Sequence, residues 1–302
     1  MSVNDELGKR MKEFYEQVPK TRLVRRMPVA IRIDGKAFHS FTKGFAKPFD
    51  EVLIKAMQRT MQYLCENIQG CVLGYHQSDE ITLILIDYRK ITSSAWFDYE
   101  VQKMCSISAS MATMAFNKFF AEEVHKFDCA IKRNPETDEL NKEQYNQFKV
   151  YQKALNKGAM FDARCFNIPK EEVCNLIYWR QLDATRNSIQ MVGQANFSHK
   201  ELQNKSCNQI QDMLMTERGI NWNNFPVYQK RGSCCVKSNV TCTFAKEEDD
   251  GTVTTGAAER PHWYIDNNIP IFKGEDRKYI DELIMVADNG SCKVYPGKVF
   301  IN

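Results

Sequence analysis

The hydrophobic pattern of the first half of the chain predicts a mixture of strands and helices. Where strands are expected, apolar residues alternate with other residues or form short β-branched runs. Where helices are expected, apolar residues recur every three or four positions. The predicted elements are, in order, a helix at 7–16, a strand at 29–33, a helix at 52–64, strands at 71–74 and 81–86, a helix at about 99–123 and a strand at 163–168.

From the second of these elements onward, the order is the βαββαβ arrangement of a ferredoxin-like sheet, the architecture of polymerase palms and of several nucleotide cyclases. We therefore predict an α+β fold. Residues 1–170 would form the palm-like catalytic domain. An inserted arm at about 130–160 would either pack on the palm or bind a partner. Residues 171–302 would form a C-terminal extension that serves RNA binding, oligomerisation or a purely structural role.

The pattern beyond residue 170 predicts helices followed by one hairpin. An amphipathic helix begins at about Lys170, and another is expected at Ile210–Met215. Residues Val236–Phe244 resemble one strand of a hairpin whose turn is Asp249-Asp250-Gly251. Nearer the N-terminus, Asp50 is the expected N-cap of the helix that follows it.

Carboxylates stand at the ends of two predicted strands. Asp34 follows the strand at 29–33 in an Asp-Gly turn, and Asp79 and Glu80 precede the strand at 81–86. The first strand of a ferredoxin-like sheet lies beside the central hairpin, so Asp34 and Asp79 would converge. Mg²⁺ prefers oxygen ligands, and two such ions would face a triphosphate. If Asp34 stood alone, its carboxylate would be explained as a cap for backbone N–H groups of the turn. The pair of aspartates favours a metal site. Glu80 points away from Asp79 in an extended segment, which leaves metal ligation and a supporting role both open.

Composition adds few constraints. The chain has 302 residues, of which 43% are hydrophobic and 26% charged, as in ordinary globular proteins. The net charge of +3 does not by itself indicate nucleic-acid binding, and the basic cluster at 9–26 is either a solvated face or a phosphate-contacting surface. The absence of a signal-peptide pattern and of a bilayer-length apolar run leads us to expect a cytoplasmic protein without membrane contact. Eleven cysteines without any Cys-x-x-Cys pair favour reduced thiols.

Five ordered motifs resemble those of the tRNA-histidine guanylyltransferase family. They are Arg32-Ile33-Asp34-Gly35 with His39, Lys47-Pro48-Phe49-Asp50, Gln77-Ser78-Asp79-Glu80, Trp179-Arg180-Gln181 with Asp183, and Asn221-Trp222-Asn223-Asn224 with Pro226-Val227-Tyr228. Together they cover roughly residues 7 to 232. Five motifs in the right order are far more specific than any one of them.

The resemblance implies a Mg²⁺-dependent nucleotidyltransferase that adds nucleotides to the 5′ end of tRNA, in the 3′-to-5′ direction. Its substrates would be GTP, ATP and other nucleoside triphosphates, with ATP activating 5′-monophosphorylated RNA, and its assembly would be a homotetramer. Two Mg²⁺ ions would be held by Asp34, Asp79 and the carbonyl of Gly35, with Glu80 as a further catalytic residue. The triphosphate would lie against the turn Gly35-Lys36-Ala37-Phe38-His39, near Ser78. The resemblance also implies phosphate or RNA contacts by Arg32, Lys47 and Lys103.

The chain departs from the eukaryotic pattern in two places. The eukaryotic His-x-Asn-Asn motif is replaced by Thr185-Arg186-Asn187-Ser188, which resembles the bacterial and archaeal guanylyltransferase-like branch. That branch is associated with template-dependent repair of truncated tRNA 5′ ends. A pair of basic residues found in other members is replaced by Tyr99-Glu100, with only Lys103 retained.

Two alternatives remain open at this point. A nucleotide cyclase or dinucleotide synthase would also use two carboxylates on a palm-like sheet. A non-catalytic RNA-binding protein would keep the scaffold without the reaction. The lysine-proline and tryptophan-arginine motifs argue against the first alternative, and the intact pair of aspartates argues against the second.

Overall fold

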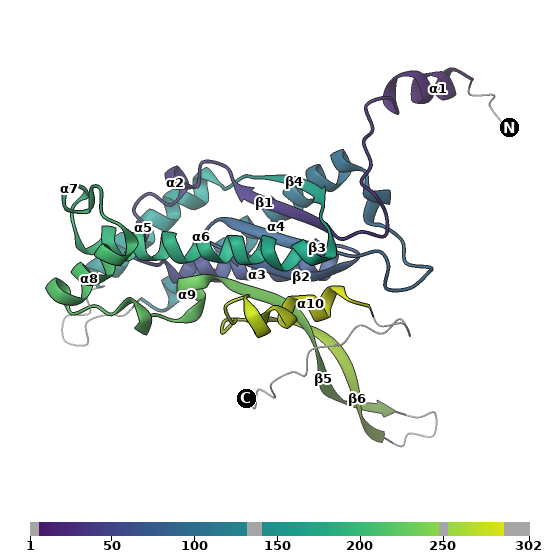
Figure 1. Ribbon diagram of the computed structural model, residues 1–302. Helices are drawn as coiled ribbons and strands as arrows, with labels where there is room; N and C mark the ends of the chain where they lie inside the picture. Colours follow the sequence, from purple (N-terminus) through teal and green to yellow (C-terminus); the bar gives the residue numbers. More distant parts are fainter. Residues whose placement is uncertain (1–5, 132–140, 248–252, 287–302) are drawn as a thin grey trace.

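The computed structural model describes residues 6–131, 141–247 and 253–286 (Figure 1). Within them, one antiparallel sheet runs through the molecule with strand order β4-β1-β3-β2-β5-β6. The strands are β1 (Val29–Gly35), β2 (Cys71–Gln77), β3 (Glu80–Leu85), β4 (Phe161–Asn167), β5 (Ser233–Glu247) and β6 (Val253–Asp266). The order of its first four strands, β4-β1-β3-β2, is that of a ferredoxin-like sheet, so the predicted fold class is confirmed.

Helices cover both faces of the sheet. The helices α3 (Glu51–Asn67) and α4 (Val101–Cys129) pack on one face, and α5 (Lys142–Lys157) packs on α4. The helices α6 (Lys170–Asn196) and α10 (Lys278–Ile284) pack on the other. Each strand therefore presents alternate side chains to two separate hydrophobic layers.

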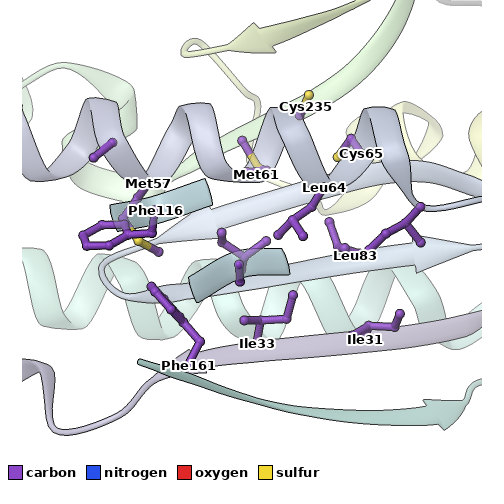
Figure 2. Close-up of a cluster of buried hydrophobic side chains, with 14 of the residues drawn as sticks. Ile31, Ile33, Met57, Met61, Leu64, Cys65, Leu83, Phe116, Phe161 and Cys235 are labelled. Atoms are coloured by element: carbon purple, nitrogen blue, oxygen red, sulfur yellow. The ribbon is translucent and has the colours of Figure 1, made fainter. Parts of the chain in front are cut away.

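The larger core lies between the sheet and helices α3 and α4. Figure 2 shows Ile31, Ile33 and Leu83 of the strands facing Met57 and Leu64 of α3. All five side chains are completely buried, and each such burial stabilises the fold by about 1.5–3 kcal/mol. The second core, on the other face, uses the intervening strand residues, which explains the alternating sequence pattern.

The remaining elements are short. They are α1 (Glu6–Met11), η1 (Lys12–Glu16), α2 (Phe38–Phe41), η2 (Trp96–Tyr99), α7 (His199–Leu202), α8 (Cys207–Arg218), η3 (Trp222–Asn224), α9 (Val227–Arg231) and η4 (Gly274–Arg277). Helix α1 stands away from the sheet, whereas α8 and η3 pack against the C-terminal part of α6 (Figure 1).

Several predicted elements extend further than their sequence patterns. The strand expected at 163–168 begins at Phe161 and ends at Asn167, and the strand expected at 236–244 is the middle part of the longer β5. The expected turn at Asp249–Gly251 lies outside the described residues. The inserted arm contains α5, whose Tyr151 is buried in the larger core, so its described part packs on the palm.

The C-terminal extension continues the palm sheet. Strand β5 pairs with β2 through residues 233–235 and then leaves the body of the molecule as a long hairpin with β6 (Figure 1). The division into two domains at residue 170 stays a prediction, as does the tetramer. Within the described ranges, no helix is long and apolar enough to cross a membrane.

Candidate active site

The two aspartates named from the sequence lie together at one end of the sheet. Asp34 is at the end of β1, and Asp79 is in the tight turn between β2 and β3. The backbone N–H of Gly35 donates to the carbonyl of Asp79 at 3.1 Å, which ties the end of β1 to this turn. Ser78, the residue before Asp79, has φ 52°, so the turn is tight enough to direct Asp79 back toward β1.

The electrostatic environment of both aspartates suits a cation. Burial, together with the charges of Glu80 and Asp162, raises the pKa of Asp34 against the weaker opposing effect of two arginines. Burial and the charge of Asp34 raise the pKa of Asp79. Neither aspartate forms an ion pair with a basic side chain in the described part of the chain. A bound divalent cation would relieve this unfavourable accumulation of negative charge.

Asp162 is a carboxylate that the sequence analysis did not identify. It lies directly opposite Asp34 in the pairing of β1 with β4, so both side chains project from the same face of the sheet. The predicted strand began at residue 163, and Asp162 therefore fell outside it. Its position after an apolar Met160-Phe161 pair was the only available signal.

A cleft of about 490 Å³ opens beside Asp79 and Gly35, whereas Asp34, the residue before Gly35, does not line it. Its lining contains Gly35, Ala37, Phe38 and His39 from the predicted triphosphate turn, together with Lys47, Asp50, Ser78, Asp79 and Met191. Lys36 belongs to the same turn but does not line the cleft, and its backbone N–H donates to the carbonyl of Met160 at 2.8 Å. A Cβ atom on Gly35 would collide with the ring of Phe38, so the turn requires glycine there.

Asp50 forms part of the wall of the cleft. One of its oxygens accepts from the backbone N–H of Leu53 at 2.9 Å and caps α3 as predicted. The other accepts from the backbone N–H of Ala46 at 2.9 Å and from the hydroxyl of Tyr151 at 2.8 Å. These bonds hold the loop that carries Lys47, a residue of the cleft lining.

Glu80 and Arg32 are directed toward each other and toward α6 instead of the cleft. One Glu80 oxygen accepts from Arg32 at 2.6 Å, and the other accepts from Arg180 at 2.7 Å. Arg180 also donates to Asp183 at 2.9 Å. Neither Glu80 nor Arg32 lines the cleft. The structure therefore gives Glu80 a supporting position between β1, β3 and α6, and it places the Arg32 guanidinium away from the triphosphate turn.

Lys103 lies far from the two aspartates. Thr113 of α4 accepts a hydrogen bond from the backbone of Phe161, the β4 residue opposite Gly35. Cys105, eight residues earlier on α4, is 3.6 Å from Cys165, which pairs with Ile31. The start of α4 is therefore farther from Asp34 than its middle. Lys103 lies at this end and is an exposed residue near Glu100. The structure does not bring Lys103 to the cleft.

A smaller cavity of about 90 Å³ adjoins the cleft and shares Asp50, Ser78 and Met191 with it. His76 lines this cavity and is fully enclosed, and burial lowers its pKa to about 4. Its neutral ring donates through Nε2 to the carbonyl of Ser78 at 2.9 Å, while its buried Nδ1 has no partner in the described residues. His76 thus supports the turn that carries Asp79.

Two of the sequence motifs meet beside this cavity. Ser188 of α6 accepts a hydrogen bond from the indole N–H of Trp222 at 3.0 Å. Asn187 donates to Asp183 at 3.3 Å and lines the cavity next to Ser188. The segment Thr185–Ser188 therefore packs α6 on η3, close to the cleft but not within it.

The chain is similar in sequence to several known proteins. Residues 8–169 match the family model described as tRNAHis guanylyltransferase. An uncharacterized protein of Acanthamoeba polyphaga mimivirus is 30% identical over 241 residues, which cover 76% of each chain. The tRNA(His) guanylyltransferase of Saccharomyces cerevisiae is 27% identical over 219 residues, or 68% of this chain and 80% of its own length.

Solved structures agree with the sequence matches. A bacterial tRNA(His) guanylyltransferase (Thg1)-like protein in complex with ATP superimposes with a TM-score of 0.71 and 40% identity over 93% of this chain and 100% of its own. A bacterial protein of the same description in complex with GTP gives 0.69 and 37% over the same shares. The Saccharomyces cerevisiae enzyme gives 0.55 and 25%, over 74% of this chain and 91% of its own.

Proposed function

The chain belongs to the tRNA(His) guanylyltransferase family and is a nucleotidyltransferase, and from that premise we propose that it adds nucleotides to the 5′ end of tRNA in the 3′-to-5′ direction, guided by the opposite strand. Membership of this family decides against the cyclase and the non-catalytic alternatives. The observation that carries the proposal is the meeting of Asp34 and Asp79 beside a cleft that contains the predicted triphosphate turn.

The carboxylates fit Mg²⁺ better than a softer metal. Among the described residues, no three His, Cys, Asp or Glu side chains are arranged to hold a metal ion. Mg²⁺ does not need such a cage, because it is usually held by one or two carboxylates, by substrate phosphates and by water. Asp34, Asp79 and the carbonyl of Gly35 would hold it. When bound, Mg²⁺ would supply charge that lowers the pKa of a nucleotide hydroxyl and stabilises a leaving phosphate.

The residues around the cleft have separate tasks in this proposal. The turn from Gly35 to His39 would hold the triphosphate, and Lys47 would add a mobile positive charge to it. The 3′-hydroxyl of the incoming nucleotide would attack the activated 5′ phosphate of the RNA. Pyrophosphate leaves if the RNA carries a triphosphate, and AMP leaves if ATP has first adenylylated a monophosphate. The ATP-bound and GTP-bound structures of the bacterial proteins support a site that accepts both nucleotides.

The proposal that the opposite strand guides the choice of nucleotide is based on the segment Thr185–Ser188, which replaces the eukaryotic His-x-Asn-Asn motif. Asn187 and Ser188 are used for contacts within the chain, to Asp183 and Trp222. No dedicated protein contact then has to select guanine, so base pairing with the opposite strand would choose the nucleotide. The greater identity to the bacterial structures than to the yeast structure agrees with this assignment. We propose repair of 5′-truncated tRNA as the reaction, rather than addition opposite a non-complementary base.

The decisive test compares Asp34→Asn and Asp79→Asn with the unchanged protein. Both variants preserve side-chain volume but remove the negative charge that a cation needs, so nucleotide addition should fall by about a hundredfold to a thousandfold, as for the loss of a principal transition-state contact. The assay follows label from α-³²P-GTP into tRNA that lacks its first nucleotide, with the opposing base varied. Asp128→Asn, at an exposed position near the end of α4, is the matched control and should keep full activity.

Two results would contradict the proposal. Near-normal addition by either active-site variant would exclude a two-carboxylate metal site. Efficient addition of GTP opposite adenosine in full-length tRNA for histidine, with slow complementary repair of truncated tRNA, would exclude template guidance while leaving the family assignment intact.

A further inference from the structure

An exposed tryptophan lies next to the candidate active site. Trp179 on α6 is 52% exposed, whereas the other three tryptophans of the chain are at most 7% exposed. Tryptophan carries the largest apolar surface of any side chain and is usually well buried. An indole left open to solvent on a well-packed helix is therefore a candidate contact residue.

Two guanidinium groups lie close to this indole. The Cζ atom of Arg180 is 4.6 Å from the ring centroid of Trp179, and that of Arg32 is 5.4 Å from it. Both arginines are fixed by the same buried carboxylate, Glu80, at 2.7 and 2.6 Å. The indole and its cationic neighbours therefore form a pre-arranged surface.

This surface adjoins the two aspartates. Arg32 and Asp34 are two positions apart on β1, so their side chains project from the same face about 7 Å apart. Glu80 is the partner of Asp34 in the pairing of β1 with β3. A flat group resting on Trp179 would thus lie on the face of the sheet from which Asp34 projects.

The surroundings of Trp179 are suited to nucleic acid. Arg164 lies opposite Arg32 on β4, and Arg186 lies two helical turns beyond Trp179 on α6, and both are exposed. Asp162 and Asp183 orient these two guanidinium groups through ion pairs. An exposed aromatic ring among arginines is the arrangement that binds a nucleobase by stacking and the adjacent phosphates by charge. Among the described residues of α6 within one turn of Trp179, Leu182 is the one exposed large apolar side chain and Leu176 is partly buried, which is too little apolar surface for a protein interface.

We infer that Trp179 is a stacking platform for the 5′-terminal nucleobase of the RNA substrate, with Arg32 and Arg180 holding the indole in place. This inference rests on the proposed function, because it names how the same site receives the RNA end. Every base has a π-face, so stacking positions the end without reading its identity. Such a contact is what an enzyme needs if the opposite strand selects the incoming nucleotide.

The first measurement separates RNA binding from chemistry. Trp179→Ala should raise the KM for a 5′-triphosphorylated acceptor-stem RNA by about tenfold or more, the usual effect of losing one base–aromatic stack. The KM for GTP should stay unchanged, because Trp179 does not line the nucleotide cleft. Trp179→Phe keeps an aromatic ring and should recover most of the loss. Met114→Ala, at a side chain 55% exposed on the opposite face, is the matched control.

The second measurement observes the indole directly. Trp179 is the exposed member of the four tryptophans, so acrylamide should quench mainly its fluorescence. The same RNA should protect Trp179 from acrylamide, and an RNA of equal charge with an abasic 5′-terminal nucleotide should not. Electrostatic binding alone would give equal protection by both RNAs and would overturn the inference.

The outcomes also distinguish this inference from the proposed function. If the unchanged protein extends RNA but Trp179→Ala keeps the original KM, the stacking inference alone fails. If the unchanged protein extends no RNA, the proposed function fails, and the comparison of intact with abasic RNA still decides whether Trp179 stacks on a base. If Trp179→Ala changes the oligomeric state in light scattering and leaves RNA protection unaltered, the surface binds a second copy of the chain and the inference is wrong.

Discussion

His76 shows how one buried residue connects stability to the active-site turn. Its pKa is lowered to about 4, because burial disfavours the charged imidazolium. Between pH 6.5 and about 4, His76 is protonated in the unfolded chain and neutral in the folded one. The free energy of unfolding should therefore decrease as pH falls from about 6.5 to about 4, by roughly 3 kcal/mol in total.

We predict that His76→Gln removes this part of the pH dependence. Chemical denaturation at several pH values between 4 and 7 measures the free energy of unfolding for both proteins. His199→Gln, at an exposed histidine, is the control and should keep the original slope. An unchanged slope in His76→Gln would mean that other groups cause the loss of stability in acid.

Glu80 illustrates how a motif residue can act through its neighbours. Its two oxygens hold Arg32 and Arg180, and these arginines flank Trp179. Removing one partner of a buried ion pair leaves an uncompensated charge, which is more costly than the pair itself is stabilising. The motif Gln77-Ser78-Asp79-Glu80 therefore combines a cleft residue with a supporting one.

At the scale of elements, the N-cap of α3 also shapes the nucleotide cleft. Asp50 accepts three hydrogen bonds, from the start of α3, from the preceding loop and from Tyr151 of α5. Asp50→Ala should lower the free energy of unfolding by about 2 kcal/mol or more, since loss of a cap alone costs about 1 kcal/mol. It should also raise the KM for GTP, because the loop that carries Lys47 loses its anchor.

Tyr151→Phe provides the graded control for Asp50→Ala. It removes one of the three bonds and keeps the ring in the core, so the free energy of unfolding should fall by only about 1 kcal/mol. Urea unfolding and steady-state kinetics measure the two effects on the same samples. If Tyr151→Phe destabilises the protein as much as Asp50→Ala does, the hydrogen bonds of Asp50 to Leu53 and Ala46 contribute nothing to the free energy of unfolding.

At the scale of the whole molecule, ligand binding and folding should be coupled through the end of the sheet. The cleft receives residues from β1, from the β2–β3 turn, from α3 and from α6, so a ligand there connects distant segments of the chain. A ligand that binds only the folded state stabilises it by about 2.7 kcal/mol at a hundredfold excess over Kd. Mg²⁺ with GTP should accordingly raise the melting temperature by several degrees.

Calorimetry with and without EDTA tests this coupling. Chelation should cancel most of the gain in the unchanged protein and in Asp128→Asn. Asp79→Asn should show little gain under any condition, because one of the two carboxylates is missing. An equal rise in Asp79→Asn would place the bound nucleotide, or its cation, elsewhere on the molecule.

The sequence by itself determined the central sheet and the two aspartates. Strand residues such as Ile31 and Ile33 alternate with polar ones because each strand has two faces, and this period is readable within a few residues. Asp34, Asp79 and Asp50 stand at the ends of such elements, where turns and caps have their own local signals. Lys47 and the turn from Gly35 to His39 followed from the family resemblance, and the cleft is lined by Lys47 and by every residue of the turn except Lys36.

Only the tertiary structure decided which side chains meet across the sheet. Glu80 reaches Arg180 from 100 positions away, Asp162 stands opposite Asp34, and Lys103 lies at the other end of β1. Strand β5 joins the sheet beside β2, although its own pattern shows no partner. The physical reason is that local periodicity records which face of an element is buried. The register between strands and the rotation of a helix over them are set by packing between segments that are distant in the chain.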